Sequence, residues 1–214
     1  MTGQKPEGLR ERKKRATYDA IATTARRLFA ERGFDAVTVA EVAVAAGVSE
    51  KTVFNHFAAK EDLVFAGGEA RMAQLLAEIA QRPPGVSVLD VFRANSEAML
   101  DVVAAGESED SLVVPRIVRG SPALQERLAV GWEREAVALA AALAAATGAS
   151  DDDLVPAVVA RTLAAALLTI FRAVFAGLLA GEDPERLVAR LRPEVARAYD
   201  QLAAGLGDYA VAGA

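Results

Sequence analysis

Apolar residues recur along this chain at intervals of three and four positions, the spacing of amphipathic helices. The first such segment covers residues 13–32 and ends at Gly33, a residue suited to the left-handed position after a helix. Its apolar positions are Tyr18, Ile21, Ala22, Ala25, Leu28 and Phe29. No segment alternates polar and apolar residues between turn residues, so no strand is expected. The pattern predicts an all-α protein.

Two short helices are predicted directly after this segment, within residues 38–57. Thr38 and Glu41 have the spacing of a capping box, in which the threonine hydroxyl accepts from a free amide and the glutamate binds back. That helix ends at Ala46-Gly47, and Ser49 caps the next one, which ends at His56 or Phe57. Two short helices joined by a turn of three or four residues that contains glycine form a helix-turn-helix.

Longer helices are predicted in the rest of the chain. One begins near Lys60 and ends near Arg82, before Pro83-Pro84-Gly85. The others are expected at residues 86–105, 110–119, 122–147, 153–181 and 184–206, because glycine, serine and proline separate these segments. Pro156 forces the helix at 153–181 to begin late or to bend in its first turns.

The second short helix has one apolar side and one polar side. At about 100° per residue, Val53 and Phe57 lie together and must face the core. Three polar side chains fall near the opposite side: Lys51, Thr52 and Asn55. Phe54 and His56 occupy the flanks. Such polar groups can contact base edges or phosphates in a major groove, although each alone is common on any exposed helix.

The charge distribution supports a nucleic-acid partner more than the net charge does. The formal net charge of −5 alone argues against nucleic acid. However, residues 1–34 contain nine Lys or Arg against four Asp or Glu, whereas residues 63–214 contain thirteen against twenty. A basic end on an acidic body is expected when that end meets phosphate. Residues 1–12 are predicted to be a flexible basic arm, and a solvated tail with no partner is the alternative.

Residues that could support catalysis or bind a metal are scarce. The chain has no cysteine, which excludes disulfides, thiolate metal sites and a cysteine nucleophile, and His56 is the only histidine. Asp151-Asp152-Asp153 is interpreted as the acidic start of a helix rather than a cation site. No phosphate-binding loop or catalytic motif is present. An enzyme is therefore not expected, and neither is a cofactor or a metal.

The cellular location of the protein is predicted from the position and length of its apolar segments. The N-terminus has no apolar stretch of the kind found in signal peptides. The most apolar region, residues 155–179, is interrupted by Arg161 and Arg172, so its uninterrupted runs are shorter than the roughly 18 residues that cross a membrane. A soluble, cytoplasmic protein without a membrane partner is expected, consistent with the lack of cysteine.

Residues 38–63 resemble the DNA-binding signature of the TetR (tetracycline repressor) family. The matching stretches run from Thr38 to Ala43, from Ala46 to Phe57 and from Lys60 to Leu63, and residues 25–34 are similar to the end of that family's first helix. The resemblance covers about residues 13–65. It implies a three-helix helix-turn-helix domain at residues 13–59 and a larger C-terminal helical domain for regulation, ligand binding and dimerisation at residues 60–214.

The resemblance also implies roles for individual residues. Thr38 and Ser49 would cap their helices and touch the DNA backbone. Base edges would be approached by Glu50, Lys51 and Thr52, and phosphates would be held by Asn55, His56 and Lys60. Phe54 stands where a tyrosine is often found, so a phosphate hydrogen bond is lost while contact with a thymine methyl stays available.

The resemblance also implies a homodimer that binds a palindromic double-stranded DNA operator. Its two chains would be joined through the helices near 153–181 and 184–206. The last helix has an apolar stripe suited to this role: Leu187, Val188, Leu191, Val195, Ala198 and Leu202. The alternative is that the stripe only serves the core of one chain.

A small-molecule effector of unknown identity is expected between the helices at 86–105, 122–147 and 153–181. The candidate lining residues are Phe92, Met99, Trp132, Phe171 and Phe175. Each is also consistent with plain core packing, because apolar side chains at helical spacing are usually buried. Arg93, Arg161 and Arg172 are candidates for contact with an acidic ligand or for an interface.

Two functions follow from these observations. The first is a DNA-binding, ligand-responsive repressor. The second is a helical small-molecule-binding or scaffold protein whose helix-turn-helix is vestigial. Salt dependence separates them, because a DNA-binding protein loses affinity steeply as salt rises.

Overall fold

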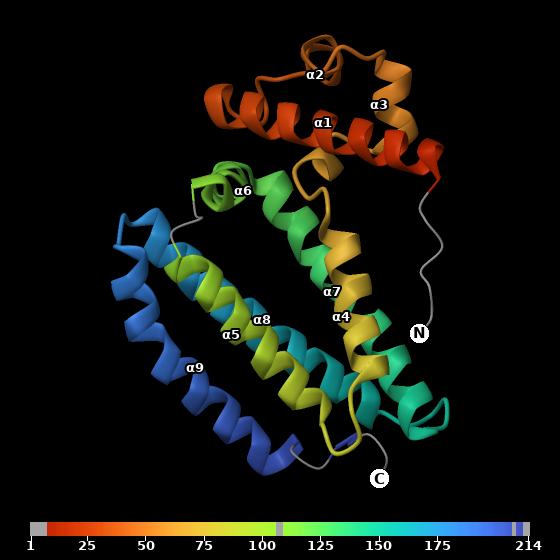
Figure 1. Cartoon of the computed structure of the whole chain (residues 1–214), viewed down its shortest axis with the longest axis vertical. Coiled ribbons are helices and arrows are strands. Elements are labelled where there is room, and N and C mark those ends of the chain that lie inside the picture. The colour runs from red at the N-terminus through yellow and green to blue at the C-terminus, as the bar shows by residue number, and fades with distance from the viewer. Residues whose placement is uncertain (1–7, 106–108, 207–208, 212–214) are drawn as a thin grey trace. The chain divides into compact units, whose positions relative to one another are not determined.

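The computed structural model describes residues 8–105, 109–206 and 209–211, and in these ranges every regular element is a helix, as predicted. Figure 1 shows their order. The elements are α1 (Leu9–Arg32), α2 (Val39–Ala45), α3 (Glu50–His56), the 3-10 helix η1 (Glu61–Leu63), α4 (Gly68–Gln81), α5 (Val88–Ala104), α6 (Glu109–Arg119), α7 (Pro122–Thr147), α8 (Val155–Leu179) and α9 (Pro184–Leu206).

The chain forms two compact units. The N-terminal unit extends to Gly68 and also includes Arg116–Gln125, whereas the C-terminal unit consists of Glu69–Pro115 and Glu126–Ala214. The N-terminal unit therefore continues beyond the boundary predicted at residue 59 and includes a segment from the middle of the chain.

The N-terminal unit is built around the buried side of α1. Ile21, Ala25 and Phe29 of this helix are almost fully buried, together with Val42 from α2 and Val53 from α3. These positions follow the helical spacing predicted from the sequence. Burial of these side chains fixes α2 and α3 on α1, because apolar side chains lose contact with water only when the three helices pack together.

Two boundaries in this unit differ from the prediction. Helix α1 begins at Leu9, so residues 9–12 of the predicted flexible arm are helical; Arg and Glu are good helix formers, and Glu11 lies in the favourable first turn. Residues 1–7 of the arm lie outside the described residues. The predicted helix from Lys60 to Arg82 is divided into η1 and α4, because Gly67 adopts a φ of +86° that interrupts the helix.

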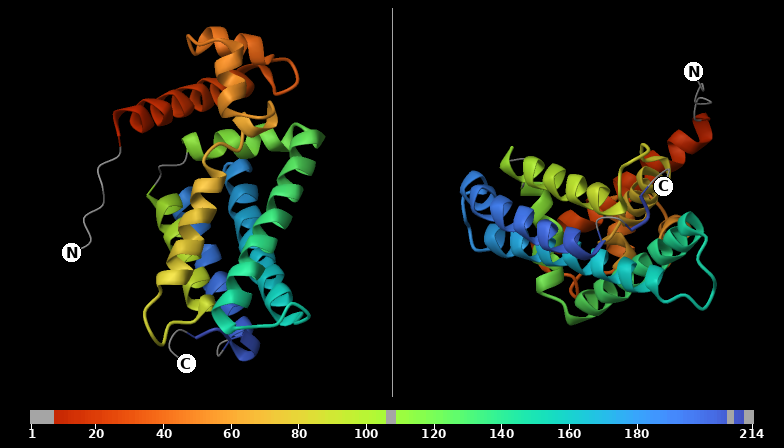
Figure 2. Two further views of the ribbon diagram at one scale, coloured as in Figure 1. Left: turned by 90° about the vertical axis from the view of Figure 1, so that its right-hand side faces the viewer. Right: turned by 90° about the horizontal axis from the view of Figure 1, so that it is seen from below.

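The C-terminal unit contains a closely packed set of helices, α5, α8 and α9, which Figure 2 shows side by side. Helices α8 and α9 form an antiparallel pair joined by a short turn at Gly181, whose φ is +82°. At Gly177 the two helices approach so closely that an added Cβ would collide with Leu187. The late start predicted for the helix at 153–181 is confirmed, since Pro156 lies in the first turn of α8.

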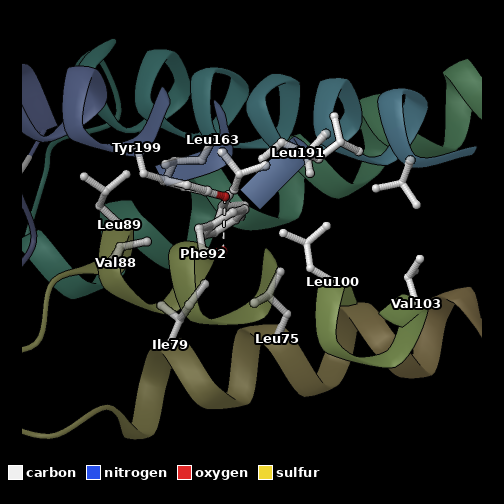
Figure 3. Packing of buried hydrophobic residues seen from close by; sticks show 14 of the residues in the cluster. Leu75, Ile79, Val88, Leu89, Phe92, Leu100, Val103, Leu163, Leu191 and Tyr199 are labelled. Carbon is white, nitrogen blue, oxygen red and sulfur yellow. Dashed lines mark hydrogen bonds between the residues drawn. The ribbon is translucent and has the colours of Figure 1, made fainter. Parts of the chain in front are cut away.

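A buried hydrogen-bonded pair joins α5 to α9 inside the apolar core (Figure 3). Tyr199 Oη donates to the backbone oxygen of Phe92 at 3.1 Å and lies 2.8 Å from Ser96 Oγ. Burial raises the pKa of the Tyr199 hydroxyl, which therefore stays neutral. Ion pairs continue the contact at the surface, since Arg93 binds Asp200 at 2.7 Å and Arg192 binds Asp101 at 2.7 Å.

Helix α8 is long and apolar enough, by length and composition alone, to cross a membrane. Arg161 and Arg172 interrupt its apolar runs, which is why the sequence does not predict a transmembrane helix here. In the fold, one side of α8 packs into the core through Val159, Leu163 and Val174, as a core helix of a helical domain does.

Candidate nucleic-acid interface

The start of α2 is held by a capping box, as its sequence predicted. Thr38 Oγ1 accepts from the Glu41 amide at 3.2 Å, and Glu41 Oε2 accepts from the Thr38 amide at 2.7 Å. Arg32, at the end of α1, donates to the other carboxylate oxygen of Glu41 at 2.7 Å. Glu41 therefore joins the end of α1 to the start of α2.

The hydrogen bonds from Thr38 and Arg32 lower the pKa of Glu41 from its usual 4.5 to about 2. The backbone amide of Thr38 is the largest cause and the Arg32 guanidinium the next. The carboxylate is therefore charged at every pH at which the protein is expected to work.

Helix α3 is oriented by its cap and by two apolar anchors. Ser49 Oγ accepts from the Thr52 amide at 3.1 Å and lies 2.8 Å from Thr52 Oγ1. Val53 and Phe57 are buried, as the helical register predicted, and Phe57 stacks on Tyr18 of α1 with ring centroids 4.5 Å apart. The opposite side of α3 therefore faces outward.

The structure exposes most of the residues predicted to contact DNA. Thr38, Ser49, Glu50, Lys51 and Asn55 are exposed, and Thr52 is half-buried beside Ser49. Phe54 has 52% of its surface exposed, so its ring is available for contact with a partner. Apart from Thr38, which caps α2, these residues lie on α3 or at its cap Ser49.

His56 and Lys60, predicted to hold phosphates, both have partners inside the N-terminal unit. The His56 ring lies 6.3 Å from the Tyr18 ring in an edge arrangement. Lys60 Nζ lies 4.2 Å from the centre of the Phe34 ring and 5.7 Å from that of Phe29, a cation–π arrangement. Both residues are half-buried, so each also contributes to packing.

Tyr18 and Arg26 connect α1 to the segment that leads into α4. The Gly67 amide donates to Tyr18 Oη at 3.1 Å, and Arg26 Nη1 donates to the Ala66 carbonyl at 3.5 Å. Gly67 is the residue with positive φ, so α1 fixes the chain at the point where it turns. The sequence analysis placed Tyr18 only among the apolar positions of the first helix and did not single out Arg26, because these contacts join positions 40 and 49 residues apart.

Val44 is an exposed apolar residue of the N-terminal unit that sequence reasoning missed. It lies on α2 and is 81% exposed. Val42 and Ala43 occupy the buried side of α2, so the helical register could have placed Val44 outward.

The predicted effector residues separate into two groups. Trp132, Phe171 and Phe175 come together, with centroid distances of 6.5 Å for Trp132–Phe171 and 4.1 Å for Phe171–Phe175. Phe92 is fully buried beneath Tyr199, and Met99 packs on the same core. The structure has an open groove between α4 and α5, but none of these five residues lines it.

Comparison with known proteins identifies the family. A model of bacterial regulatory proteins of the tetR family matches residues 21–66. The chain is 32% identical over 155 residues to the HTH-type transcriptional regulator TcmR of Streptomyces glaucescens, a match that covers 70% of this chain and 69% of that protein. This chain belongs to the TetR family. It is accordingly a DNA-binding transcriptional regulator, and its family consists of regulators rather than enzymes.

Two further similarities extend over more of this TetR-family chain. The HTH-type transcriptional repressor Rv1474c of Mycobacterium tuberculosis is 32% identical over 180 residues, covering 80% of this chain and 87% of that protein. The solved complex of SmeT with triclosan has the same fold, with a TM-score of 0.54 at 22% identity, over 93% of this chain and 96% of that one.

Proposed function

We propose that this regulator is an effector-responsive repressor that acts in the cytoplasm as a homodimer on a palindromic operator. The observation that supports it most directly is the geometry of α3, whose apolar side is anchored by Val53 and Phe57 while Lys51 and Asn55 face outward. A helix with one free polar side can enter a major groove. The relative Rv1474c is a repressor by name, which favours repression.

The exposed residues of the N-terminal unit divide by chemistry into those that read bases and those that bind phosphate. Glu50, Lys51 and Thr52 lie in the first turn of α3, where a recognition helix contacts base edges. Phe54 offers an apolar surface suited to a thymine methyl. The backbone would be bound by Thr38, Ser49 and Asn55 and, in part, by His56 and Lys60.

A dimer is needed because one short helix reads too few bases for useful specificity. Two N-terminal units about 34–36 Å apart would reach successive major grooves on one side of the duplex. The operator then has the two-fold symmetry of the protein.

Helix α8 offers the better surface for this dimer. The stripe of α9 that was predicted to reach the partner is largely used inside one chain, since Leu187, Val188, Leu191 and Val195 are buried. In contrast, α8 has an exposed face at helical spacing on which small and apolar side chains lie beside two arginines: Val158, Arg161, Ala165, Thr169, Arg172 and Ala176, of which Val158 is 61% exposed. Small residues allow two helices to approach closely. The dimer therefore centres on α8, and the polar side of α9 contributes at the edge.

The effector would contact the aromatic group of Trp132, Phe171 and Phe175 in the C-terminal unit. These three side chains are half-buried rather than sealed in the core, so a ligand can reach them with little repacking. Phe92 is less suited, because it is fully buried in the contact between α5 and α9. The triclosan complex of SmeT is an example of a small aromatic ligand bound to a protein of this fold.

Selection of bound duplexes from a random DNA pool tests the proposal. The expected result is one enriched palindrome, bound by two chains per duplex in sedimentation analysis. Binding should weaken steeply with salt, since each phosphate contact releases counterions. Lack of any enriched sequence, together with retention that does not depend on salt, would favour the scaffold alternative.

A further inference from the structure

The first turns of α1 contain four cations that have no partner within the described ranges of the chain. Arg10, Arg12, Lys13 and Lys14 are exposed, and their side chains make neither a hydrogen bond nor an ion pair there. Because this segment is helical rather than a loose arm, each cation has a fixed direction relative to the rest of the N-terminal unit.

The helical register shows which of these cations lie on the side of α2. Eighteen residues make five full turns at 3.6 residues per turn, so Arg10 faces the same direction as Leu28, and Lys14 the same as Arg32. Leu28 lines a groove against Ala40 and Val44 of α2, and Arg32 binds Glu41 of α2. Arg10 and Lys14 therefore project on the side of α1 that carries α2. Arg12 is two residues from each of them, a rotation of about 200° around the helix axis, so its side chain lies on the opposite side.

Helix α1 contacts the end of α3 and the segment after it through Tyr18, one to two turns beyond these cations. The Tyr18 ring stacks on Phe57, which follows α3, and its hydroxyl accepts from Gly67. Eight residues separate Arg10 from Tyr18, a distance of about 12 Å at 1.5 Å per residue. At about 3.4 Å per base pair, this length equals that of roughly three or four base pairs of a duplex.

We propose that Arg10 and Lys14 bind backbone phosphates of the operator in the flank outside the bases read by α3. The proposal rests on the proposed function, since it needs α3 to lie in the groove. Phosphate is the expected partner because these side chains are long, exposed and without a group that would orient them toward a base edge. The operator would thus be longer than its sequence-specific core.

The test measures affinity on two duplexes of the selected operator. One duplex ends at the last selected base pair on each side, and the other continues for about eight base pairs of unrelated sequence. Lys14→Gln and Arg10→Gln are compared with Arg12→Gln, a control that removes the same charge from the other side of the same helix. Circular dichroism should show that the three variants are folded, as expected for substitutions at exposed positions.

On the long duplex, Lys14→Gln should weaken binding about fivefold per contact at 0.15 M salt and lower the slope of log K against log salt by about one. Arg12→Gln should bind as the unchanged protein does. On the short duplex, all variants should bind alike, because the flanking phosphates are absent.

Equal affinities of Lys14→Gln and Arg12→Gln on the long duplex would overturn the proposal, and so would an unchanged Lys14→Gln defect on the short one. If the unchanged protein bound neither duplex, the failure would instead concern the proposed function.

Discussion

At the scale of single residues, the interface depends on side chains whose roles divide between support and contact. Glu41 and Tyr18 hold helices together and need not touch DNA. Lys51 and Asn55 have no supporting role in the described structure and project outward. Substitutions at these two kinds of residue should therefore separate effects on stability from effects on DNA affinity.

Glu41→Gln should lower stability at neutral pH and remove a part of its pH dependence. The folded pKa of about 2 lies below the usual 4.5, so the carboxylate contributes stability that is fully present above about pH 4.5 and is lost as the pH falls toward 2. Urea unfolding of both proteins between pH 7 and pH 2.5 measures the difference. It should shrink as the pH falls, and a difference that is constant over this range would contradict the assigned pKa.

Lys51→Ala should relax the preference for one base pair in each half-site. A well-formed base contact contributes about 1–3 kcal/mol of discrimination, so affinities for operators that differ at that position should converge. Binding of single-base operator variants measures this. Lys60→Gln is the control: it should weaken binding to all sequences alike and, because its ammonium lies over Phe34, also lower thermal stability slightly. If Lys51→Ala lowered all affinities equally, its contact would be with phosphate.

At the scale of helices, α8 and α9 differ in how much of their apolar surface is buried within one chain, although the sequence predicts that both form the dimer interface. The apolar residues of α9 pack on α5 and α8, and its outward side is charged. Apart from Arg161 and Arg172, the exposed side of α8 is also small or apolar, so burial within one chain uses only part of its apolar surface. This asymmetry makes α8 the element at which the dimer should be most sensitive.

Ala165→Arg should dissociate the dimer without unfolding the chain. Ala165 is exposed in one chain, but at the centre of the α8 face its replacement would bury an unpaired charge at the two-fold axis. The dimer dissociation constant should rise at least roughly a hundredfold, since such burial costs several kcal/mol. Sedimentation equilibrium measures it. Ala138→Arg, at an exposed position of α7, should leave the dimer intact. If Ala138→Arg dissociated the dimer and Ala165→Arg did not, the interface would lie on α7 instead.

At the scale of the whole molecule, function requires the C-terminal unit to alter DNA binding by the N-terminal unit. Such coupling is reciprocal, because an effector that weakens DNA binding must itself be weakened by DNA. Trp132 is the only tryptophan of the chain, so its fluorescence reports directly from the proposed effector site.

The apolar dye anilinonaphthalene sulfonate should quench Trp132 and should bind more weakly when operator DNA is present. Phe175→Ala should lower dye affinity about tenfold, since an aromatic contact adds about 0.5–1.5 kcal/mol beyond its buried area and the Phe175 ring lies edge-on to Phe171 in this group. Phe54→Ala, in the N-terminal unit, is the control and should leave the dye titration unchanged. Dye binding that is insensitive to both Phe175→Ala and DNA would place the effector site elsewhere.

The sequence by itself determined the helices and the local anchoring of the recognition helix. Caps at Thr38 and Ser49, the inward register of Val53 and Phe57, and the late start of α8 at Pro156 all depend on residues within a few positions of each other. Such short-range rules hold in almost any fold, so they can be read from the chain directly.

Only the tertiary structure decided which surfaces are already occupied. It placed Lys60 over Phe34, used the apolar stripe of α9 inside the chain, gathered Trp132 with Phe171 and Phe175, and directed Arg10 and Lys14 to the side of α2. Each of these outcomes joins segments far apart in the sequence. Helical periodicity shows that a side chain must be buried, but the partner that buries it is chosen by packing among all the helices.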